Sequence, residues 1–382
     1  MGPATFRIPS TIHYGAGALD ELGAAARQLG VRHALLVTDK GMVQLGVAAQ
    51  ARQRLEAAGT RVTLFDGVEP DPTLHNAAAG LALLRHSGTR PAPDGIVAVG
   101  GGSSIDCAKA IAVQGANHEP LPEFMGVDKI PRAGLPVVAV PTTAGTGSEV
   151  TQVMVITDTQ RDVKMMFASR YCLCAAAIVD PALTLSMPQG LTASVGVDAL
   201  THAIEAYVSR RAQPMTDLLA LSAIRLIAHS LRVAYREGEN LEARSQVMLG
   251  AMQAGMAFSN ASVALVHGMA RPLGACFHLT HGVSIAVLLP VVTEFSLAAA
   301  PERYARIAAE MGATDVVTAI RALNRDVAIP SMRQIGIEEG RYEAALEKMA
   351  VDALASGSPA NNPRPATAAE IVALYRRAYG GN

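Results

Sequence analysis

The first half of the chain alternates short apolar runs with stretches that have the spacing of amphipathic helices. The apolar runs have the length of strands rather than of helices. Such an alternation is typical of a parallel sheet that is covered by helices. We predict strands at residues 34–38, 60–65, 95–100 and 136–141, and helices at 47–58, 73–86 and 105–114.

The pattern changes at the segment Asp180-Pro-Ala-Leu-Thr-Leu-Ser-Met-Pro188. Beyond it the chain has long helical patterns rich in Ala and Leu, such as 216–237 and 241–258, and few β-branched runs. A length of 382 residues fits two domains or one large domain. We therefore predict an α/β domain over residues 1–187 and an all-helical domain over residues 188–382.

Composition argues against several classes of protein. The formal net charge is -1, so there is no basic excess to neutralise the phosphates of a nucleic acid. We expect no membrane partner, because no uninterrupted apolar run reaches the roughly 18–20 residues of a span. The N-terminus lacks the basic start and apolar core of a signal peptide. The 4 cysteines form no Cys-x-x-Cys pair, and we expect buried thiols in a soluble, cytoplasmic protein.

Two pairs of polar residues in the second half indicate a metal site. Asp198 and His202 are four residues apart in a predicted helix, so their side chains share one face. His267 and His281 flank a segment that Pro272 and Gly274 should break, which would place the two histidines on separate elements joined by a turn. One carboxylate and three imidazoles suit a divalent transition metal, either iron or zinc. Such a metal with an open position lowers the pKa of a bound alcohol.

The same residues have simpler interpretations. An Asp followed by a His four residues later is often a surface pair. His267 lies in an apolar run, where a hydrogen-bonded core histidine is common. His278 lies three residues before His281 and is a rival ligand. Spacing alone does not rank the two.

Two glycine-rich loops follow predicted strands. The first is Gly100-Gly-Gly-Ser-Ser-Ile-Asp106, which leads into a helix, and the second is Pro141-Thr-Thr-Ala-Gly-Thr-Gly-Ser-Glu-Val150. A backbone without Cβ atoms approaches a ligand closely, and a helix N-terminus offers free N–H groups to a pyrophosphate. Each loop alone is weak support, since the first is not the GxGxxG fingerprint and its serines also suit an N-cap. Together they indicate a nucleotide site.

Asp39 ends the predicted strand at 34–38. An acidic residue at the carboxyl end of a strand accepts hydrogen bonds from an adenosine ribose and repels a 2′-phosphate, which favours NAD over NADP. The simpler interpretation is a solvent-facing Asp that caps the next helix.

In combination these segments resemble the iron-containing (group III) alcohol dehydrogenases, and the resemblance spans essentially the whole chain. Its markers are Gly100-Gly-Gly-Ser, Pro141-Thr-Thr-Ala-Gly-Thr-Gly-Ser-Glu-Val-Thr, Gly196-Val-Asp-Ala-Leu-Thr-His-Ala-Ile-Glu, and His267-Gly-Met-Ala with His281-Gly. Among its members, the chain resembles those that act on lactaldehyde and 1,2-propanediol. The resemblance implies a dinucleotide-binding N-terminal domain, a helical metal-binding and catalytic C-terminal domain, and catalysis in the cleft between them. It also implies a homodimer or a higher homo-oligomer, with N-terminal strands pairing across subunits.

The resemblance also implies roles for individual residues. The metal ligands become Asp198, His202, His267 and His281, which leaves His278 as a neighbour. The nicotinamide-dinucleotide contacts become Asp39, Asp71, Gly101, Gly102, Ser103, Thr142, Thr143, Gly145, Thr146, Val153, Lys164 and Leu183. The expected cofactors are Fe(2+), with Zn(2+) as an alternative in the purified protein, and NAD.

One residue departs from the family pattern. Many relatives have a second histidine four residues after the third metal ligand, where it assists proton transfer, and this chain has Arg271 there. A guanidinium stays charged near neutral pH and does not shuttle protons. Either water and a ribose hydroxyl therefore carry the proton, or His278 contributes. Arg271 is an anchor for an anionic substrate group or a structural residue that pairs with a neighbouring acid. Val153 replaces a polar side chain of the propanediol enzymes, which predicts a roomier and more apolar pocket.

We expect reversible hydride transfer between a primary alcohol or aldehyde and NAD(H). The alternative is a hydroxyacid–oxoacid transhydrogenase, or a reductase of an anionic semialdehyde in which Arg271 is the anion anchor. A protein of another class, which binds metal and nucleotide without catalysis, would lack turnover of NADH.

Overall fold

The computed structural model describes residues 4–85, 91–161 and 163–380. The chain divides into two compact units. The first consists of residues 7–143 and 147–185 and is an α/β unit. The second begins at Ser186, is helical, and includes two short earlier segments, residues 4–6 and Ala144–Thr146.

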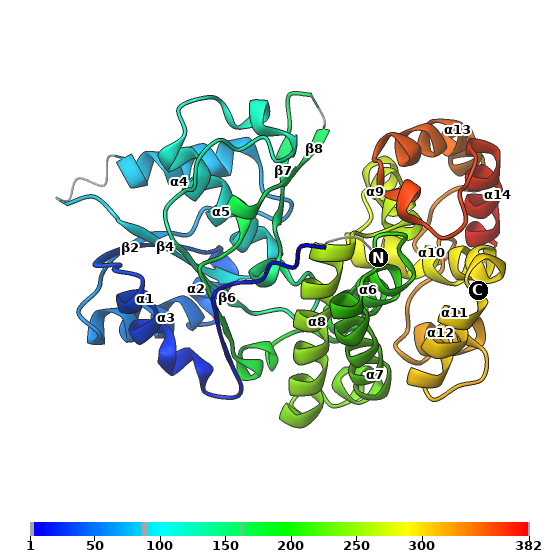
Figure 1. Ribbon diagram of the computed structural model, residues 1–382, viewed down its shortest axis with the longest axis horizontal. Coiled ribbons are helices and arrows are strands. Elements are labelled where there is room, and N and C mark those ends of the chain that lie inside the picture. The colour runs from blue at the N-terminus through cyan, green and yellow to red at the C-terminus, as the bar shows by residue number, and fades with distance from the viewer. Residues whose placement is uncertain (1–3, 86–90, 162, 381–382) are drawn as a thin grey trace. The chain divides into compact units, whose positions relative to one another are not determined.

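A six-stranded parallel sheet forms the centre of the α/β unit (Figure 1). Its strand order is β1-β9-β6-β4-β2-β3. The predicted parallel sheet is confirmed, and all four predicted strands belong to it. The strands are β1 (Thr11–Tyr14), β2 (His33–Val37), β3 (Arg61–Phe65), β4 (Gly95–Gly100), β6 (Val137–Pro141) and β9 (Ala176–Val179).

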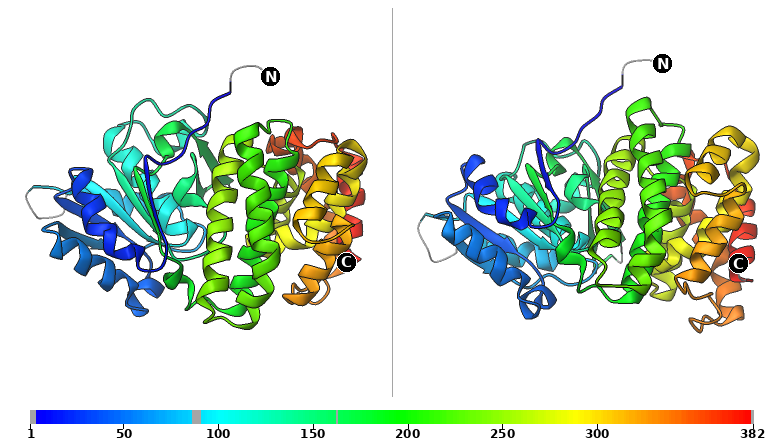
Figure 2. Two further views of the ribbon diagram at one scale, coloured as in Figure 1. Left: turned by 60° about the horizontal axis from the view of Figure 1, so that its bottom comes forward. Right: turned by 90° about the horizontal axis from the view of Figure 1, so that it is seen from below.

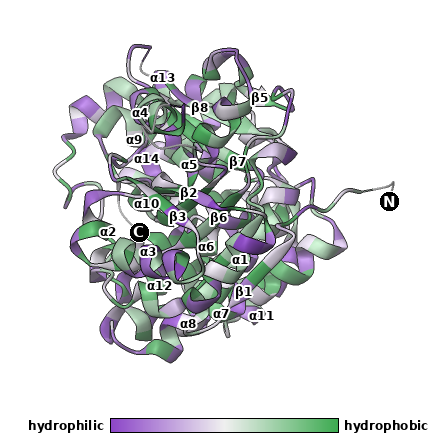
Figure 3. Ribbon diagram, turned by 90° about the vertical axis from the view of Figure 1, so that its left-hand side faces the viewer, coloured by the Kyte–Doolittle hydropathy of each residue, from purple (hydrophilic) through white to green (hydrophobic). Residues whose placement is uncertain are grey.

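Helices cover both faces of this sheet. Successive residues of a strand point to opposite faces, so a strand that is apolar throughout needs a cover on each side. In β4, Val97 and Val99 pack into one apolar cluster, and Ile96 and Ala98 pack into another. Helices α1 and α3 contribute to the first cluster, and α4 and α5 contribute to the second. The covering helices carry both apolar and polar residues around their circumference (Figure 3). The helices of this unit are α1 (Leu22–Gln28), α2 (Lys40–Gln44), α3 (Val47–Ala57), α4 (Leu74–Arg85) and α5 (Gly102–Ala116).

A second, three-stranded sheet was not predicted. Its order is β5-β8-β7, with β7 and β8 antiparallel. Alternate residues of β7 are buried, in keeping with a sheet that has only one covered face. The strands are β5 (Gly126–Val127), β7 (Val153–Asp158) and β8 (Val163–Ala168).

The second unit is built from helices, and every strand assigned within the described residues lies before Ser186. Helices α6, α7 and α8 lie side by side (Figure 2). Helix α6 is buried from Gly196 to Val208, so any polar side chain in that stretch needs a partner inside the protein. The helices are α6 (Gln189–Val208), α7 (Pro214–Arg236), α8 (Leu241–Ala261), α9 (Leu265–Phe277), α10 (His281–Ser296), α11 (Pro301–Glu310), α12 (Val316–Asp326), α13 (Glu339–Ala355) and α14 (Ala368–Tyr379).

The predicted break between His267 and His281 exists but lies elsewhere. Helix α9 continues through Pro272 and ends at His278, whose φ of 54° is left-handed and terminates the helix. Burial of its apolar residues holds α9 together, and the hydroxyl of Tyr375 donates a hydrogen bond of 2.7 Å to the carbonyl of Met269, in the turn before the proline. Tertiary packing therefore overrides the helix-breaking tendency of proline at this position.

Two helices among the described residues are long and apolar enough, by length and composition, to cross a membrane: Pro214–Arg236 and His281–Ala299. The sequence expectation considered only uninterrupted apolar runs and missed both. Their most apolar windows are 39% and 67% buried inside the protein. The apolar residues of both helices thus contribute to the packing of the helical unit.

Candidate functional site

The four predicted metal ligands come from three helices of the second unit. Asp198 and His202 lie one turn apart on α6, His267 lies in the first turn of α9, and His281 is the first residue of α10. Asp198, His202 and His267 are buried, whereas the side chain of His281 is 44% exposed. The cluster therefore has one accessible side.

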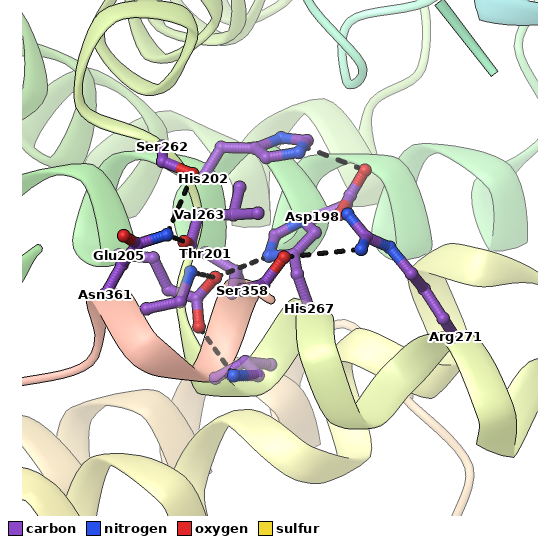
Figure 4. A network of polar contacts seen from close by, with 12 residues as sticks. Asp198, Thr201, His202, Glu205, Ser262, Val263, His267, Arg271, Ser358 and Asn361 are labelled. Carbon is purple, nitrogen blue, oxygen red and sulfur yellow. Dashed lines mark hydrogen bonds and ion pairs between the residues drawn. The ribbon is translucent and has the colours of Figure 1, made fainter. Parts of the chain in front are cut away.

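The ligand atoms of Asp198, His267 and His281 all lie within 4.8 Å of one another. Oδ1 of Asp198 is 3.5 Å from Nε2 of His267 and 3.8 Å from Nε2 of His281. His202 adjoins this group, with Nδ1 at 4.0 Å from Oδ2 of Asp198 and its ring stacked on that of His267 (Figure 4). The structure thus brings together all four predicted side chains.

The hydrogen bonding of three atoms among these side chains shows whether a cation fits. Oδ1 of Asp198, Nδ1 of His202 and Nε2 of His267 are buried and have no hydrogen-bond partner among the described residues. Buried polar atoms without partners are costly, and here all three belong to groups that bind transition metals. The carbonyl of Gly145 accepts a hydrogen bond from the His202 ring, so the other ring nitrogen, Nδ1, can present a lone pair. The donor set therefore fits a divalent metal.

Burial and neighbouring charges shift the pKa values in the cluster. Burial, only partly offset by Asp198, lowers the pKa of His202 to about 3. Burial acts in the same direction on His267, but Glu205 and Asp198 outweigh it and raise its pKa to about 9. Burial opposes ionisation of Asp198, yet the surrounding imidazoles hold its pKa below the ordinary value. An ionised Asp198 and a neutral His202 are the protonation states that metal binding requires.

His278 and Arg271 lie outside the group of ligand atoms. His278 is exposed at the end of α9 and is not part of the three-residue cluster found among the described residues. Arg271 lies one turn after His267 and donates a hydrogen bond of 3.3 Å to Oγ of Ser358. Burial lowers the pKa of Arg271, and the charge of Glu205 opposes this effect. These contacts agree with a structural role for Arg271, and its role as an anion anchor stays a prediction.

The sequence analysis missed a buried carboxylate beside the cluster. Glu205 on α6 accepts a hydrogen bond of 2.6 Å from Nδ1 of His267. The signal was present in the sequence, because Asp198, His202 and Glu205 are spaced four and three residues apart and so share one face of a helix.

Several predicted dinucleotide contacts meet at the carboxyl ends of β2, β4 and β6, which are neighbours in the sheet. The N–H of Thr142 donates to the carbonyl of Gly100 at 3.0 Å, which joins the two glycine-rich loops. A Cβ atom at Gly101 would lie 3.3 Å from Thr143. Asp39 caps α2 by accepting from the N–H of Met42, and its other oxygen accepts from Oγ of Ser104 at 3.3 Å. Asp39 therefore caps a helix and also faces the first loop.

The other predicted contacts are more dispersed. Lys164 and Asp71 form an exposed ion pair of 2.8 Å. Val153 begins β7, and the buried Leu183 packs into an apolar cluster of the α/β unit. Gly102 and Ser103 lie in the first turn of α5. Gly145 and Thr146 belong to the short segment that groups with the helical unit.

A buried lysine fixes the second loop to α5. Nζ of Lys109, whose residue is 1% exposed, donates to the carbonyls of Ser148, Thr151 and Val153 at 2.7, 3.1 and 2.8 Å. Asp106, one turn earlier on α5, accepts from Oγ of Ser148 and, at 2.9 Å, from the N–H of Val155. The loop and the start of β7 are therefore tied to the helix that begins at the first loop.

Replacing this lysine with an apolar residue should cost considerable stability. Lys109→Met removes the donor from several buried carbonyls and leaves Asp106 without a cation, so we expect the free energy of unfolding to fall by about 3 kcal/mol. Urea denaturation followed by circular dichroism measures the change. The control is Lys164→Met, which removes an exposed ion pair and should alter stability by no more than about 1 kcal/mol. Equal stability of the two variants would contradict the assigned role of Lys109.

Comparisons with known proteins show the family of this chain. Two family models match, "Iron-containing alcohol dehydrogenase" over residues 9–181 and "Fe-containing alcohol dehydrogenase family, C-terminal" over residues 192–379. The chain is 41% identical to the 1,3-propanediol dehydrogenase of Klebsiella pneumoniae, covering 98% of both proteins. It is 38% identical to the lactaldehyde reductase of Escherichia coli K12, covering 97% of this chain and 98% of that protein. A solved structure of a 1,3-propanediol oxidoreductase superposes with a TM-score of 0.94 at 40% identity, over 99% of this chain and 100% of that one. The resemblance found in the sequence is thus confirmed, and the chain belongs to the iron-containing alcohol dehydrogenase family.

Proposed function

We propose that this protein transfers a hydride reversibly between a primary alcohol or aldehyde and NAD(H), with a divalent metal held by Asp198, His202, His267 and His281. Membership of the iron-containing alcohol dehydrogenase family supports the class of reaction. The observation that carries the metal site is the gathering of the ligand atoms of Asp198, His267 and His281 within 4.8 Å of one another. Beside Asp198, three buried atoms of the proposed ligands also have no hydrogen-bond partner among the described residues. A cation there would satisfy all three.

The roles of the chain's own residues follow from their chemistry. When bound, the metal supplies a Lewis acid for the alcohol or carbonyl oxygen, and nicotinamide supplies the hydride acceptor or donor. Asp198 provides the anionic ligand, which offsets part of the charge of the cation. The buried rings of His202 and His267 hold their ligand atoms in fixed positions, while the partly exposed His281 lies on the accessible side of the cluster. Catalysis in this proposal rests on positioning and electrostatics.

The dinucleotide would bind at the glycine-rich loops of the α/β unit. The N-terminus of α5 follows Gly101 and offers N–H groups to the pyrophosphate. Gly100 and Gly101 lack a Cβ atom, which lets the backbone of the first loop approach a ligand closely, and the hydrogen bond from Thr142 to Gly100 joins the second loop to it. Asp39 lies beside the first loop and would accept hydrogen bonds from a ribose.

Iron is the metal that the family implies, and the same ligands also accept zinc. The proposed substrate is a small uncharged alcohol or aldehyde. The alternative, a transhydrogenase or a reductase of an anionic semialdehyde that uses Arg271, is not favoured by relatives named for propanediol, alcohol and lactaldehyde.

An assay of NADH consumption tests the proposed function. Metal-free protein reloaded with Fe(II) or Zn(II) would receive short uncharged aldehydes, with succinic semialdehyde for the anionic class. We expect turnover that depends on the metal and is faster with the uncharged aldehydes. No turnover with any aldehyde in protein that binds both metal and NADH would contradict the proposal. Preference for the semialdehyde would reinstate the anionic alternative.

Asp39 should set the preference for NADH over NADPH. Asp39→Asn removes the charge that repels a 2′-phosphate but retains the cap of α2, because Asn is an equally good N-cap. We expect the ratio of kcat/KM for NADPH to that for NADH to rise roughly tenfold, which corresponds to about 1.4 kcal/mol. Steady-state kinetics with both cofactors measure this ratio.

The control for this variant is Asp94→Asn. Asp94 precedes β4 and accepts hydrogen bonds of 2.9 Å from the N–H groups of Arg32, just before β2, and of His33, its first residue. It therefore lies at the amino ends of these strands. Its replacement should leave the cofactor ratio unchanged. An unchanged ratio in Asp39→Asn as well would remove Asp39 from the proposed cofactor contacts.

A homodimer and a cytoplasmic location complete the proposal. Strand β1 ends the strand order of the large sheet, the position at which a strand from a second copy can add. The 4 cysteines form no disulfide among the described residues, and three of them are buried and Cys276 partly so, which agrees with a reducing compartment. Size-exclusion chromatography with light scattering tests the dimer.

A further inference from the structure

We infer that Glu205 is the positioning residue of the metal site: it orients the ring of His267 so that Nε2 faces the cation. This inference rests on the proposed function, because it assigns a second layer to the proposed metal site. It concerns a residue that contacts a ligand and not the metal itself.

The contacts of Glu205 are all directed at the start of α9. Its Oε2 accepts from Nδ1 of His267 at 2.6 Å and from the N–H of Ala264 at 2.8 Å, and its Oε1 accepts from the N–H of Val266 at 2.6 Å (Figure 4). Glu205 is 2% exposed and lies on α6, the helix that also carries Asp198. One carboxylate thus joins the helix of the anionic ligand to the helix of the third ligand.

The sequence around His267 explains why a carboxylate is needed there. The first N–H groups of a helix have no partner within the helix, and α9 has Ala264 at its N-cap, whose side chain cannot accept a hydrogen bond. These groups are buried, so water does not satisfy them. A negative charge is also favourable at the positive end of the helix dipole. Glu205 therefore supplies the cap from a different helix.

The hydrogen bond to the ring fixes which nitrogen can bind a metal. An ionised carboxylate only accepts, so Nδ1 of His267 must carry the proton. Nε2 is then the nitrogen that a cation would bind in place of a proton. It lies 3.5 Å from Oδ1 of Asp198, and both atoms are buried without a hydrogen-bond partner among the described residues. An acceptor behind a histidine ligand fixes the ring and makes it a better donor, and loss of such a group typically weakens metal binding 10- to 100-fold.

The experiment replaces the acid with its amide and measures metal binding directly. Glu205→Gln keeps the size of the side chain but has one acceptor oxygen for three donors, so the ring or a backbone N–H loses its partner. We expect the dissociation constant for Zn(II), measured against a competing chelator, to rise about 10- to 100-fold. The absorption spectrum of the Co(II)-loaded variant should also differ from that of the wild type, because the ligand geometry changes.

Glu310→Gln is the matched control. Glu310 is a 5% exposed carboxylate of the same helical unit that pairs with Arg225 and Arg306 at 2.6 Å and contacts none of the four proposed ligands. Its replacement should lower the thermal midpoint of the metal-free protein but leave the dissociation constant and the Co(II) spectrum unchanged. A purely structural Glu205 would give the same result as this control and would overturn the inference.

A second measurement needs no Glu205 variant. In Zn(II)-loaded wild-type protein, residue-assigned nitrogen-15 NMR signals of the histidine rings should show that His267 is metal-bound at Nε2 and carries a proton on Nδ1. A His267 ring without a proton on Nδ1 would overturn the inference even if Glu205→Gln did not fold. If wild-type protein bound no metal at all, the proposed function would fail, whereas normal binding in both wild type and Glu205→Gln would refute only the role of Glu205.

Discussion

The His267→Ala variant is expected to lose its metal and nearly all alcohol dehydrogenase activity while remaining folded and able to bind NADH. His267 is 3% exposed, and its Nε2 is one of the three unpartnered atoms that face the proposed cation. Removing one of four ligands opens the site, and a Lewis acid stabilises the transition state by several kcal/mol. We therefore expect kcat/KM to fall on the order of a thousandfold, the equivalent of about 4 kcal/mol.

Metal content by mass spectrometry and NADH consumption measure the two losses, and circular dichroism checks the fold. His278→Asn is the matched control, since His278 was the rival ligand in the sequence and Asn tolerates its left-handed backbone. This control should keep both metal and activity. Full activity in His267→Ala, or loss of metal in His278→Asn, would refute the assignment of the ligands.

The parallel sheet could be predicted because its sequence signal is local and repeated. The strand predicted at 95–100 is β4, and the helix predicted at 47–58 is α3 with one residue fewer. Strands of this sheet are apolar at successive residues because helices cover both of its faces. The small sheet of β5, β7 and β8 gave no comparable signal, because β5 has only two residues and β7 is buried on one face only.

The metal cluster could be predicted only in part from spacing. Asp198 and His202 lie four residues apart in a helix and therefore share a face of α6, so their proximity follows from the sequence. The approach of His267 and His281 depends on how α9 and α10 pack against α6, which no local pattern encodes. The resemblance to a family supplied that information, and the structure adds the distances.

Two features of the site depend on tertiary contacts that a local pattern does not reveal. Pro272 and Gly274 predicted a break that α9 does not have, because packing and the contact between Tyr375 and Met269 maintain the helix. Glu205 has the helical spacing of the ligands, but only the structure brings it to the unsatisfied start of α9. In the second case a distant part of the chain satisfies backbone N–H groups that have no partner within their own helix.

Gly100→Ala should abolish tight NADH binding and leave the metal site intact. The backbone of Gly100 has a φ of 149°, which L-residues rarely adopt, and an added Cβ would lie 2.8 Å from Cβ of Ser104 and 3.2 Å from Oδ2 of Asp39. The loop must move to relieve the contact with Ser104, because that neighbour is not the flexible end of a side chain. Strain of this kind costs about 1–3 kcal/mol, so we expect the dissociation constant for NADH to rise roughly 10- to 100-fold.

Fluorescence titration with NADH measures this change, and metal content measured on the same samples shows whether the other unit is affected. Gly59→Ala separates strain from position: its φ is 83°, also left-handed, but an added Cβ meets nothing within 4 Å, and Gly59 precedes β3 at the amino end of that strand. Gly59→Ala should therefore lose some stability and still bind NADH as the wild type does. If both variants bound NADH equally well, the first loop could not be a cofactor contact. If Gly100→Ala lost metal together with NADH, the two sites would not be independent.

The expected pattern of the two variants is reciprocal: His267→Ala loses metal but not NADH, and Gly100→Ala loses NADH but not metal. The reason is that the proposed ligands and the first glycine-rich loop belong to different compact units of the chain.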